Sequence, residues 1–172
     1  MDFLQMAKDR FSCRKFESKA VEKEKIDKIL TAALVAPTAV NRQPQRILVV
    51  DDSELLTRLK EATKYTFDAP VCFVICVDRE LAYSRGYDGK NSAEIDGSIV
   101  TTHMMLEAQD LGLGTTWVMA FNPIKVREIL EIPDNLEILA MLPTGYPASD
   151  VQVSPLHSKR IDIDEMVSYN KF

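Results

Sequence analysis

The chain has 172 residues, of which 46% are hydrophobic and 27% charged, and its 21 basic and 26 acidic residues give a net charge of −5. This composition excludes a disordered or low-complexity chain, and the acidic balance argues against broad electrostatic binding to nucleic acid or anionic lipid. We expect a single domain over residues 1–172 and a cytoplasmic location, because no apolar stretch is long enough for a membrane span and the first residues are too charged for a signal peptide.

Hydrophobic periodicity predicts alternating helices and strands in the first half of the chain. The second helix should stop at Pro37, and Ser53 is a plausible N-cap for the third. The apolar run at 71–77 is continuous, so we expect a strand that is buried on both faces. The expected elements are helices at 2–9, 21–36 and 53–62 and strands at 47–50 and 71–77.

The second half of the chain begins with a polar stretch at 79–90, which we expect to be a mobile loop. A long helix should follow and end at Gly112, and Asn122 with Pro123 marks the start of another helix. Periodicity alone does not choose between a parallel and a mixed sheet. The expected elements here are helices at 92–111, 123–130 and 162–169 and strands at 115–119 and 138–142.

Familiar catalytic patterns are missing from the sequence. The three cysteines form no CxxC pair and have no neighbouring histidine, which argues against a disulfide framework and against a zinc site. The chain contains no GxSxG, HExxH, P-loop or complete GxGxxG motif. Such a chain is typical of a redox protein whose cofactor carries out the difficult electronic steps.

Three polar segments are candidates for binding, and each has a plain structural alternative. Residues 10–14 (Arg-Phe-Ser-Cys-Arg) could bind an anion or form a solvated turn. Residues 36–44 form a loop bounded by prolines that could present amide groups to a flat heterocycle or simply connect two elements. The basic pair at 159–160 could add to an anion site or belong to a solvated tail.

Taken in order, residues 10–14, 36–44, 112–117 (Gly-Leu-Gly-Thr-Thr-Trp) and 142–147 (Leu-Pro-Thr-Gly-Tyr-Pro) resemble the FMN-dependent nitroreductase family. The resemblance implies an α+β fold with a central, mostly antiparallel sheet flanked by helices. It also implies an intertwined homodimer with FMN sites at the subunit interface, a small-molecule electron acceptor, and no nucleic acid or membrane partner.

The resemblance also implies which residues bind FMN. The first segment should contact the phosphate, ribityl and pyrimidine side, with Arg14 favoured beside the N1–C2 carbonyl, and the basic pair should complete the phosphate clamp. The loop of the other subunit should cover the isoalloxazine ring, and backbone groups should lie near flavin N5. No catalytic side chain and no metal ligand are implied. The implied residues are Arg10, Phe11, Ser12, Arg14, Pro37, Thr38, Asn41, Val118, Met119, Ala120, Lys159 and Arg160.

By the same resemblance, NADH or NADPH delivers hydride to flavin N5, and a nitroaromatic, quinone or similar flat electrophile then accepts it in a ping-pong reaction. Gln45 and Met119-Ala120 depart from the usual family pattern. These departures keep open an FMN-binding, storage or sensing protein without an efficient reductase cycle. Dehalogenation, flavin breakdown and a cofactor-free interaction module are further alternatives.

Overall fold

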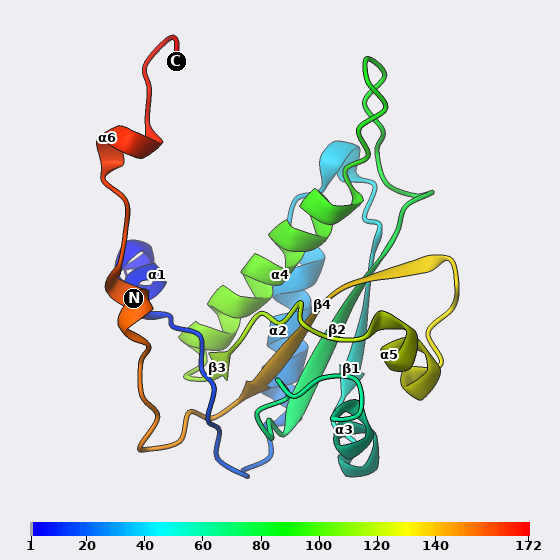
Figure 1. The fold of residues 1–172 in the computed structure, drawn as a ribbon, viewed down its shortest axis with the longest axis vertical. Helices are drawn as coiled ribbons and strands as arrows, with labels where there is room; N and C mark the ends of the chain where they lie inside the picture. The colour runs from blue at the N-terminus through cyan, green and yellow to red at the C-terminus, as the bar shows by residue number, and fades with distance from the viewer. Residues whose placement is uncertain (1) are drawn as a thin grey trace.

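The computed structural model describes residues 2–172 as a four-stranded sheet flanked by helices (Figure 1). All strand pairs are antiparallel and their order is β1-β2-β4-β3, which answers the question left open by the sequence pattern. The strands are β1 (Gln45–Val50), β2 (Val71–Asp78), β3 (Gly114–Thr115) and β4 (Leu136–Gly145). The helices are α1 (Phe3–Asp9), α2 (Lys23–Val35), η1 (Ala39–Asn41), α3 (Ser53–Leu59), α4 (Ala93–Asp110), α5 (Pro123–Leu130), η2 (Pro155–Ser158) and α6 (Ile163–Met166).

Strand β2 is the centre of the core, and residues 71–77 are buried on both faces as predicted. Phe73 and Ile75 join the cluster formed with α2 and α4, whereas Cys72 and Val74 join the cluster formed with α3 and α5. Burying each large apolar side chain contributes about 1.5–3 kcal/mol. The helices therefore form one layer on each face of the sheet.

The helix ends are set by local capping. Asn122 caps α5 by accepting hydrogen bonds from the N–H groups of Ile124 (3.0 Å) and Lys125 (3.3 Å), and Pro123 opens the helix as predicted. Gly112, with φ of +75°, follows α4 as expected.

The prediction that Ser53 caps α3 was wrong. The carboxylate of Asp52 accepts from the N–H groups of Glu54 (3.0 Å) and Leu55 (2.9 Å), so Ser53 becomes the first helical residue. A carboxylate at this position also interacts favourably with the positive end of the helix dipole. The helix ends at Leu59 and turns replace its expected last part.

Strands β3 and β4 differ most in length from the prediction, and β1 begins at Gln45 rather than at residue 47. Strand β3 covers only Gly114–Thr115, and of the remaining predicted residues only Val118 pairs, through an isolated bridge to Met141. Strand β4 is longer than expected, because its residues pair with both β2 and β3. The lengths of β3 and β4 are therefore set by pairing with neighbouring strands rather than by the local apolar pattern.

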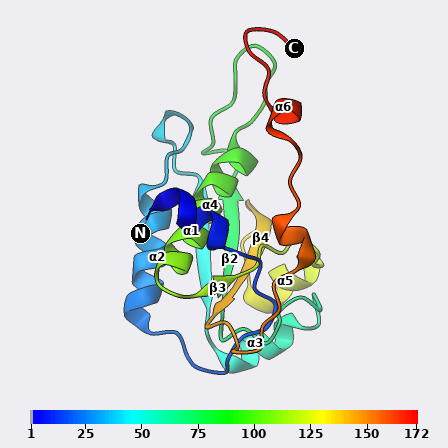
Figure 2. The same ribbon diagram turned by 90° about the vertical axis from the view of Figure 1, so that its left-hand side faces the viewer.

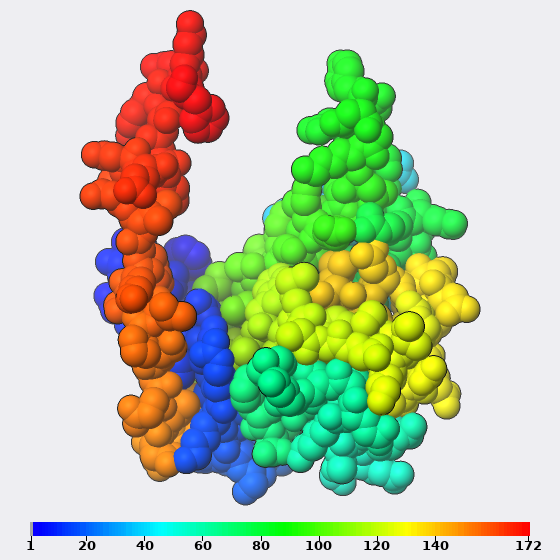
Figure 3. Space-filling model, viewed as in Figure 1, coloured from blue at the N-terminus to red at the C-terminus, as the bar shows by residue number. Residues whose placement is uncertain are grey.

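The segment at 79–90 forms a hairpin-like excursion whose base is closed by a bridge between Ser84 and Asn91. The C-terminal tail, residues 161–172, is exposed throughout and stands clear of the body (Figures 1 and 3). Figure 2 shows α1 lying over α4 at the other end of the chain. Within residues 2–172, no helix is long and apolar enough to cross a membrane.

Candidate functional site

One cavity of about 220 Å³ brings together both ends of the chain. Four of the residues predicted to bind the cofactor at the N-terminal side line it, together with Arg160 from the C-terminal side. Two distant cationic segments therefore converge on one site, as the resemblance implied. The lining residues are Arg10, Phe11, Ser12, Arg14, Ser154, Leu156, His157 and Arg160.

Arg10 gives this cavity its electrostatic character. Its Nη1 atom is buried and has no hydrogen-bond partner among the described residues. Burial lowers the pKa of Arg10, and the positive charge of Arg160 lowers it further. A half-buried guanidinium with an unpaired Nη1 atom beside a second guanidinium is unfavourable, and an anion between the two would relieve this. The cavity is therefore suited to a doubly charged anion such as a phosphate ester.

Backbone pairing places residues 10–14 against the sheet. Ser12 forms a parallel bridge with Thr115, and the N–H of Cys13 donates to the Thr115 carbonyl at 2.9 Å. The hydroxyl of Thr116 donates to the Cys13 carbonyl. A Cβ atom on Gly114 would lie 2.6 Å from Cys13 Cβ, so this close approach requires glycine.

Of the two residues in the C-terminal basic pair, only Arg160 lines the cavity. Arg160 lines the cavity, and its guanidinium donates to the carbonyls of Lys159 (2.7 Å) and His157. Lys159 is exposed and does not line the cavity. The short helix η2, capped by Ser154, turns the chain so that His157 also faces the cavity.

Residues 118–120 follow β3 after Thr116 and Trp117. Val118 is buried and exchanges two backbone hydrogen bonds of 2.9 Å with Met141. The Thr63 hydroxyl donates to the carbonyl of Ala120 at 2.7 Å. Within the described chain, the N–H groups of Met119 and Ala120 donate to no protein acceptor, while the Met119 side chain is 72% exposed. Two backbone donors are thus available for a ligand.

The proline-bounded loop, residues 37–43, has an unusual backbone. Val40, Asn41 and Gln43 have φ values of 53°, 54° and 50°, in the left-handed region that L residues avoid. A non-glycine residue there costs about 1 kcal/mol, so surrounding contacts must hold the loop. The Thr38 hydroxyl accepts from the N–H of Gln43 at 3.0 Å, and the Asn41 side chain accepts from Gln43 Nε2 at 3.1 Å.

The proline-bounded loop and the cationic cavity lie at opposite ends of α4. Ala39 is bonded to Asp96 in the first turn of this helix, whereas Thr115, which holds Cys13, follows its last turn. The helix has 18 residues and is about 27 Å long. A single chain therefore does not bring Pro37, Thr38 and Asn41 to the residues around Arg10, and the contribution of a second subunit stays a prediction.

The sequence analysis missed two residues at these sites. Asp96 is almost fully buried and anchors the proline-bounded loop, and an acidic residue on the apolar side of a predicted helix was the signal that could have identified it. His157 was not identified as a site residue, although the Ser154-Pro155 pair before it is a helix-start pattern.

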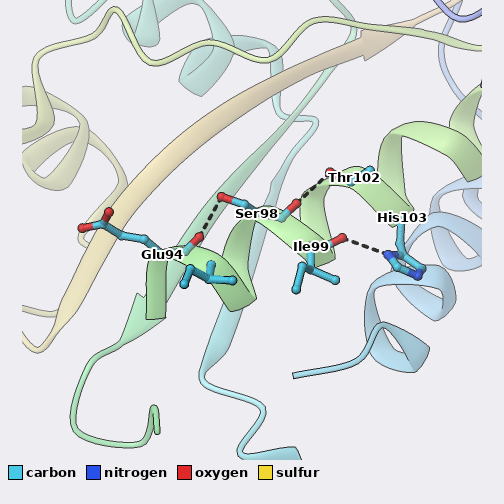
Figure 4. A pocket seen from close by; sticks show the side chains of 6 residues that line it. Glu94, Ser98, Ile99, Thr102 and His103 are labelled. Carbon is cyan, nitrogen blue, oxygen red and sulfur yellow. Dashed lines mark hydrogen bonds between the residues drawn. The ribbon is translucent and has the colours of Figure 1, made fainter. Parts of the chain in front are cut away.

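The exposed face of α4 forms a shallow groove of about 490 Å³, shown in Figure 4. Ser98 and Thr102 donate to backbone carbonyls four residues earlier, at 2.7 and 2.8 Å, and His103 Nδ1 lies 2.9 Å from the Ile99 carbonyl. These polar groups are satisfied within the helix, so Ile95 and Ile99 present an apolar surface.

A larger cavity of about 990 Å³ continues this surface between α1, α2 and α4. Its apolar residues include Phe3, Met6, Val35 and Leu106. The helices α1, α2 and α4 thus carry a broad apolar area on the outside of the chain, of the kind that marks an interaction surface.

Comparison with known proteins agrees with this architecture. The sequence model of the nitroreductase family matches residues 7–67 and 64–146. A nitroreductase family protein of Clostridium difficile 630 has 43% sequence identity, a TM-score of 0.92 and full coverage of both chains. A protein of Methanothermobacter thermautotrophicus, provisionally described as an NADH dehydrogenase/NAD(P)H nitroreductase, is 34% identical over 87% of this chain and 80% of its own length.

A third relative is named for its cofactor. It is an FMN-dependent nitroreductase of Clostridium difficile R20291, with 30% identity, a TM-score of 0.79 and coverage of 98% of this chain and 99% of that one. The family match spans most of the chain, and the fold and the order of the motifs agree with it. This chain belongs to the nitroreductase family.

Proposed function

We propose that this chain is an NAD(P)H oxidoreductase that uses FMN to reduce nitroaromatic compounds, quinones or similar flat electrophiles. The unpaired, buried Nη1 atom of Arg10, in a cavity that it shares with Arg160, is the observation that carries this proposal. The names of the relatives, which include NAD(P)H nitroreductases and an FMN-dependent enzyme, support it.

The cationic cavity fits the phosphate of FMN. Arg10 and Arg160 supply guanidinium donors, and a dianionic phosphate would relieve both the burial of Arg10 and the repulsion between the two cations. Ser12 and Arg14 line the same cavity and extend the binding site toward the ribityl chain. Lys159, which lies outside the cavity, would add its charge only after the tail has moved.

Backbone and loop groups fit the flavin ring. The available N–H groups of Met119 and Ala120 would hold the ring on the N5 side, and residues 37–43 of the second subunit would cover it. A bound FMN would supply the hydride-transfer chemistry that links NADH or NADPH to the electrophile in a ping-pong reaction. The chain's own residues bind and orient the reactants, and no side chain is assigned a proton-transfer role.

The apolar face of α4 and the C-terminal tail support an intertwined homodimer. The tail has no protein cover, yet it carries apolar side chains that water disfavours. A second copy would bury both the tail and the α4 face and would bring the proline-bounded loop to the cationic cavity. The exposed apolar residues of the tail are Ile161, Ile163, Met166, Val167, Tyr169 and Phe172.

The test is a titration of the purified protein with FMN, followed by NADH and NADPH oxidation in the presence of menadione or a nitrofuran. We expect tight FMN binding and turnover that depends on the acceptor. Tight binding without turnover would instead identify an FMN-storage or sensing protein. A protein that binds no FMN would contradict the proposal altogether.

A further inference from the structure

A buried carboxylate joins the proline-bounded loop to the start of α4. Asp96 is only 1% exposed, and both of its oxygen atoms accept hydrogen bonds. Oδ1 accepts from the N–H of Ala39 at 2.9 Å, and Oδ2 accepts from the Ser92 hydroxyl at 2.7 Å. From this arrangement we infer that Asp96 is a positioning residue that fixes the proline-bounded loop, and through it the entrance to the active site.

The loop needs an external anchor near its middle. The hydrogen bonds between Thr38, Asn41 and Gln43 fix its shape but do not attach it to the rest of the chain. Near its end, the Gln43 carbonyl accepts from the Arg46 guanidinium of β1 at 3.2 Å. The ends of the loop are held by the burial of Ala36 and Pro44. Between these ends, the bond from Ala39 to Asp96 is the side-chain contact that ties the strained backbone of Val40 and its neighbours to a helix.

The same carboxylate also fixes the base of the segment at 79–91. The hydroxyl of Ser92 donates to Asp96. The N–H of Ser92 donates to the Tyr83 carbonyl at 2.8 Å, which attaches the segment to the start of α4. Asp96 lies in the first turn of α4, where the positive end of the helix dipole favours a negative charge. One side chain thus sets the relative position of the loop, the helix and the base of the segment.

This role rests on the proposed function, in which the loop of one subunit covers the flavin of the other. Asp96 is buried and its oxygen atoms are bonded to Ala39 and Ser92, so we expect it to act through the loop. Loosening the loop should weaken FMN binding and raise KM for the electron acceptor. The kcat at saturating acceptor should change much less, because the groups around Arg10 and Ala120 remain in place.

The first readout is hydrogen exchange of the loop, which requires no flavin. In Asp96→Ala we expect exchange of a peptide covering residues 36–44 to become at least about tenfold faster, because a hydrogen bond to a charged group is lost. Asp96→Asn keeps one acceptor oxygen and the side-chain volume, so it should have a smaller effect. Exchange of a peptide from β2 should stay unchanged and shows that each variant is folded.

The second readout is steady-state kinetics of the FMN-loaded protein. Asp96→Ala should raise KM for menadione by about tenfold or more, and Asp96→Asn should restore most of the wild-type value. Asp134→Asn is the matched control, because it removes an exposed carboxylate whose ion-pair partner is Arg127, outside the loop. It should change neither loop exchange nor KM.

The outcomes separate the two proposals. Unchanged loop exchange in Asp96→Ala would overturn the anchoring role, whatever the protein catalyses. Faster exchange with unchanged FMN affinity and unchanged KM would overturn the positioning role while the oxidoreductase activity stands. A wild-type protein without FMN binding would overturn the proposed function, and with it the link from the loop to the active site.

Discussion

Arg10 has a different energetic role in the free and the ligand-bound protein. Its guanidinium is partly desolvated and unpaired at Nη1, which is unfavourable until an anion binds. In Arg10→Ala, we expect FMN affinity to fall by about 10- to 100-fold, since a charge-assisted hydrogen bond contributes about 1.5–3 kcal/mol. The flavin-free variant should be at least as stable as the wild type. Fluorescence titration with FMN and thermal unfolding measure the two effects.

Arg58→Ala is the control for Arg10→Ala, because Arg58 is an exposed cation in the last turn of α3. It should leave FMN affinity unchanged. Equal affinity in wild type and Arg10→Ala would show that the phosphate lies elsewhere. A large loss of stability in the flavin-free variant would show that Arg10 is a structural residue.

The lowered pKa of Glu22 predicts how the thermal stability of the protein should change with pH. The Tyr146 hydroxyl donates to the Glu22 carboxylate, and this bond, with smaller contributions that include Lys19, lowers the pKa of Glu22 from 4.5 to about 2. A lowered native pKa stabilises the fold above the unfolded pKa, and this stabilisation is lost as pH falls from about 5 to 2. The Tm difference between wild type and Glu22→Gln should therefore be largest near neutral pH and shrink over this range.

Glu24→Gln provides the reference for this experiment. It removes the same charge from the first turn of α2 but does not remove the bond to Tyr146. A Tm difference for Glu22→Gln that stays constant between pH 7 and pH 2 would show that the Tyr146 bond does not favour the ionised carboxylate in solution.

At the scale of elements, Gly114 connects the sheet to the binding site. Any side chain at this position meets Cys13 and pushes the segment with Ser12 away from β3. In Gly114→Ala, we expect a destabilisation of about 1–3 kcal/mol from overpacking, together with weaker FMN binding. Chemical denaturation and FMN titration measure these changes.

Gly86→Ala is the matched glycine control, because a Cβ atom at Gly86 would meet no atom within 4 Å. It should leave both stability and FMN affinity unchanged. If Gly114→Ala behaves like Gly86→Ala, the close approach of residues 10–14 to β3 does not position the site.

Elements with strong local signals could be predicted from the sequence, and elements shaped by distant partners could not. The start of α5 at Asn122 and Pro123 follows from capping chemistry, and the burial of β2 follows from its continuous apolar run. The length of β3 depends on how far β4 pairs beside it, which no local pattern reports. The cap of α3 was misassigned because Asp52 and Ser53 are both good capping residues.

At the candidate site, too, some features could be predicted from the sequence and others depend on distant partners. Convergence of Arg10 with Arg160 was implied by family motifs and is present in the single chain, whereas Lys159 lies outside the cavity. Asp96 was not identified, because its role depends on Ala39, a residue 57 positions away whose contribution is a backbone N–H. Every residue type except proline has a backbone N–H, so the sequence does not indicate which residue will donate to Asp96.

For the whole molecule, the proposed dimer predicts that a charge at one exposed isoleucine dissociates the dimer, whereas a charge at another leaves it intact. Ile95 lies on the groove of α4, and Ile124 lies on α5 outside this surface. Ile95→Asp should raise the dimer dissociation constant by at least about 100-fold, because a charge would be buried in an apolar interface. FMN affinity should fall with it, since each site needs the loop of the second subunit. Sedimentation velocity over a concentration series measures the dissociation.

Ile124→Asp should remain dimeric and retain FMN, which controls for the added charge. A wild-type chain that sediments as a monomer while it binds FMN tightly would contradict the shared site. Dissociation of both isoleucine variants to the same extent would show that the α4 face is not the interface.

The most direct test of the central claim is anaerobic mixing of the purified, FMN-loaded protein with NADH and then NADPH, followed by visible absorption. The account predicts that at least one nicotinamide bleaches the flavin and that menadione restores its colour. Flavin that stays oxidised with both nicotinamides, or a protein that takes up no FMN, would contradict an FMN-dependent NAD(P)H oxidoreductase.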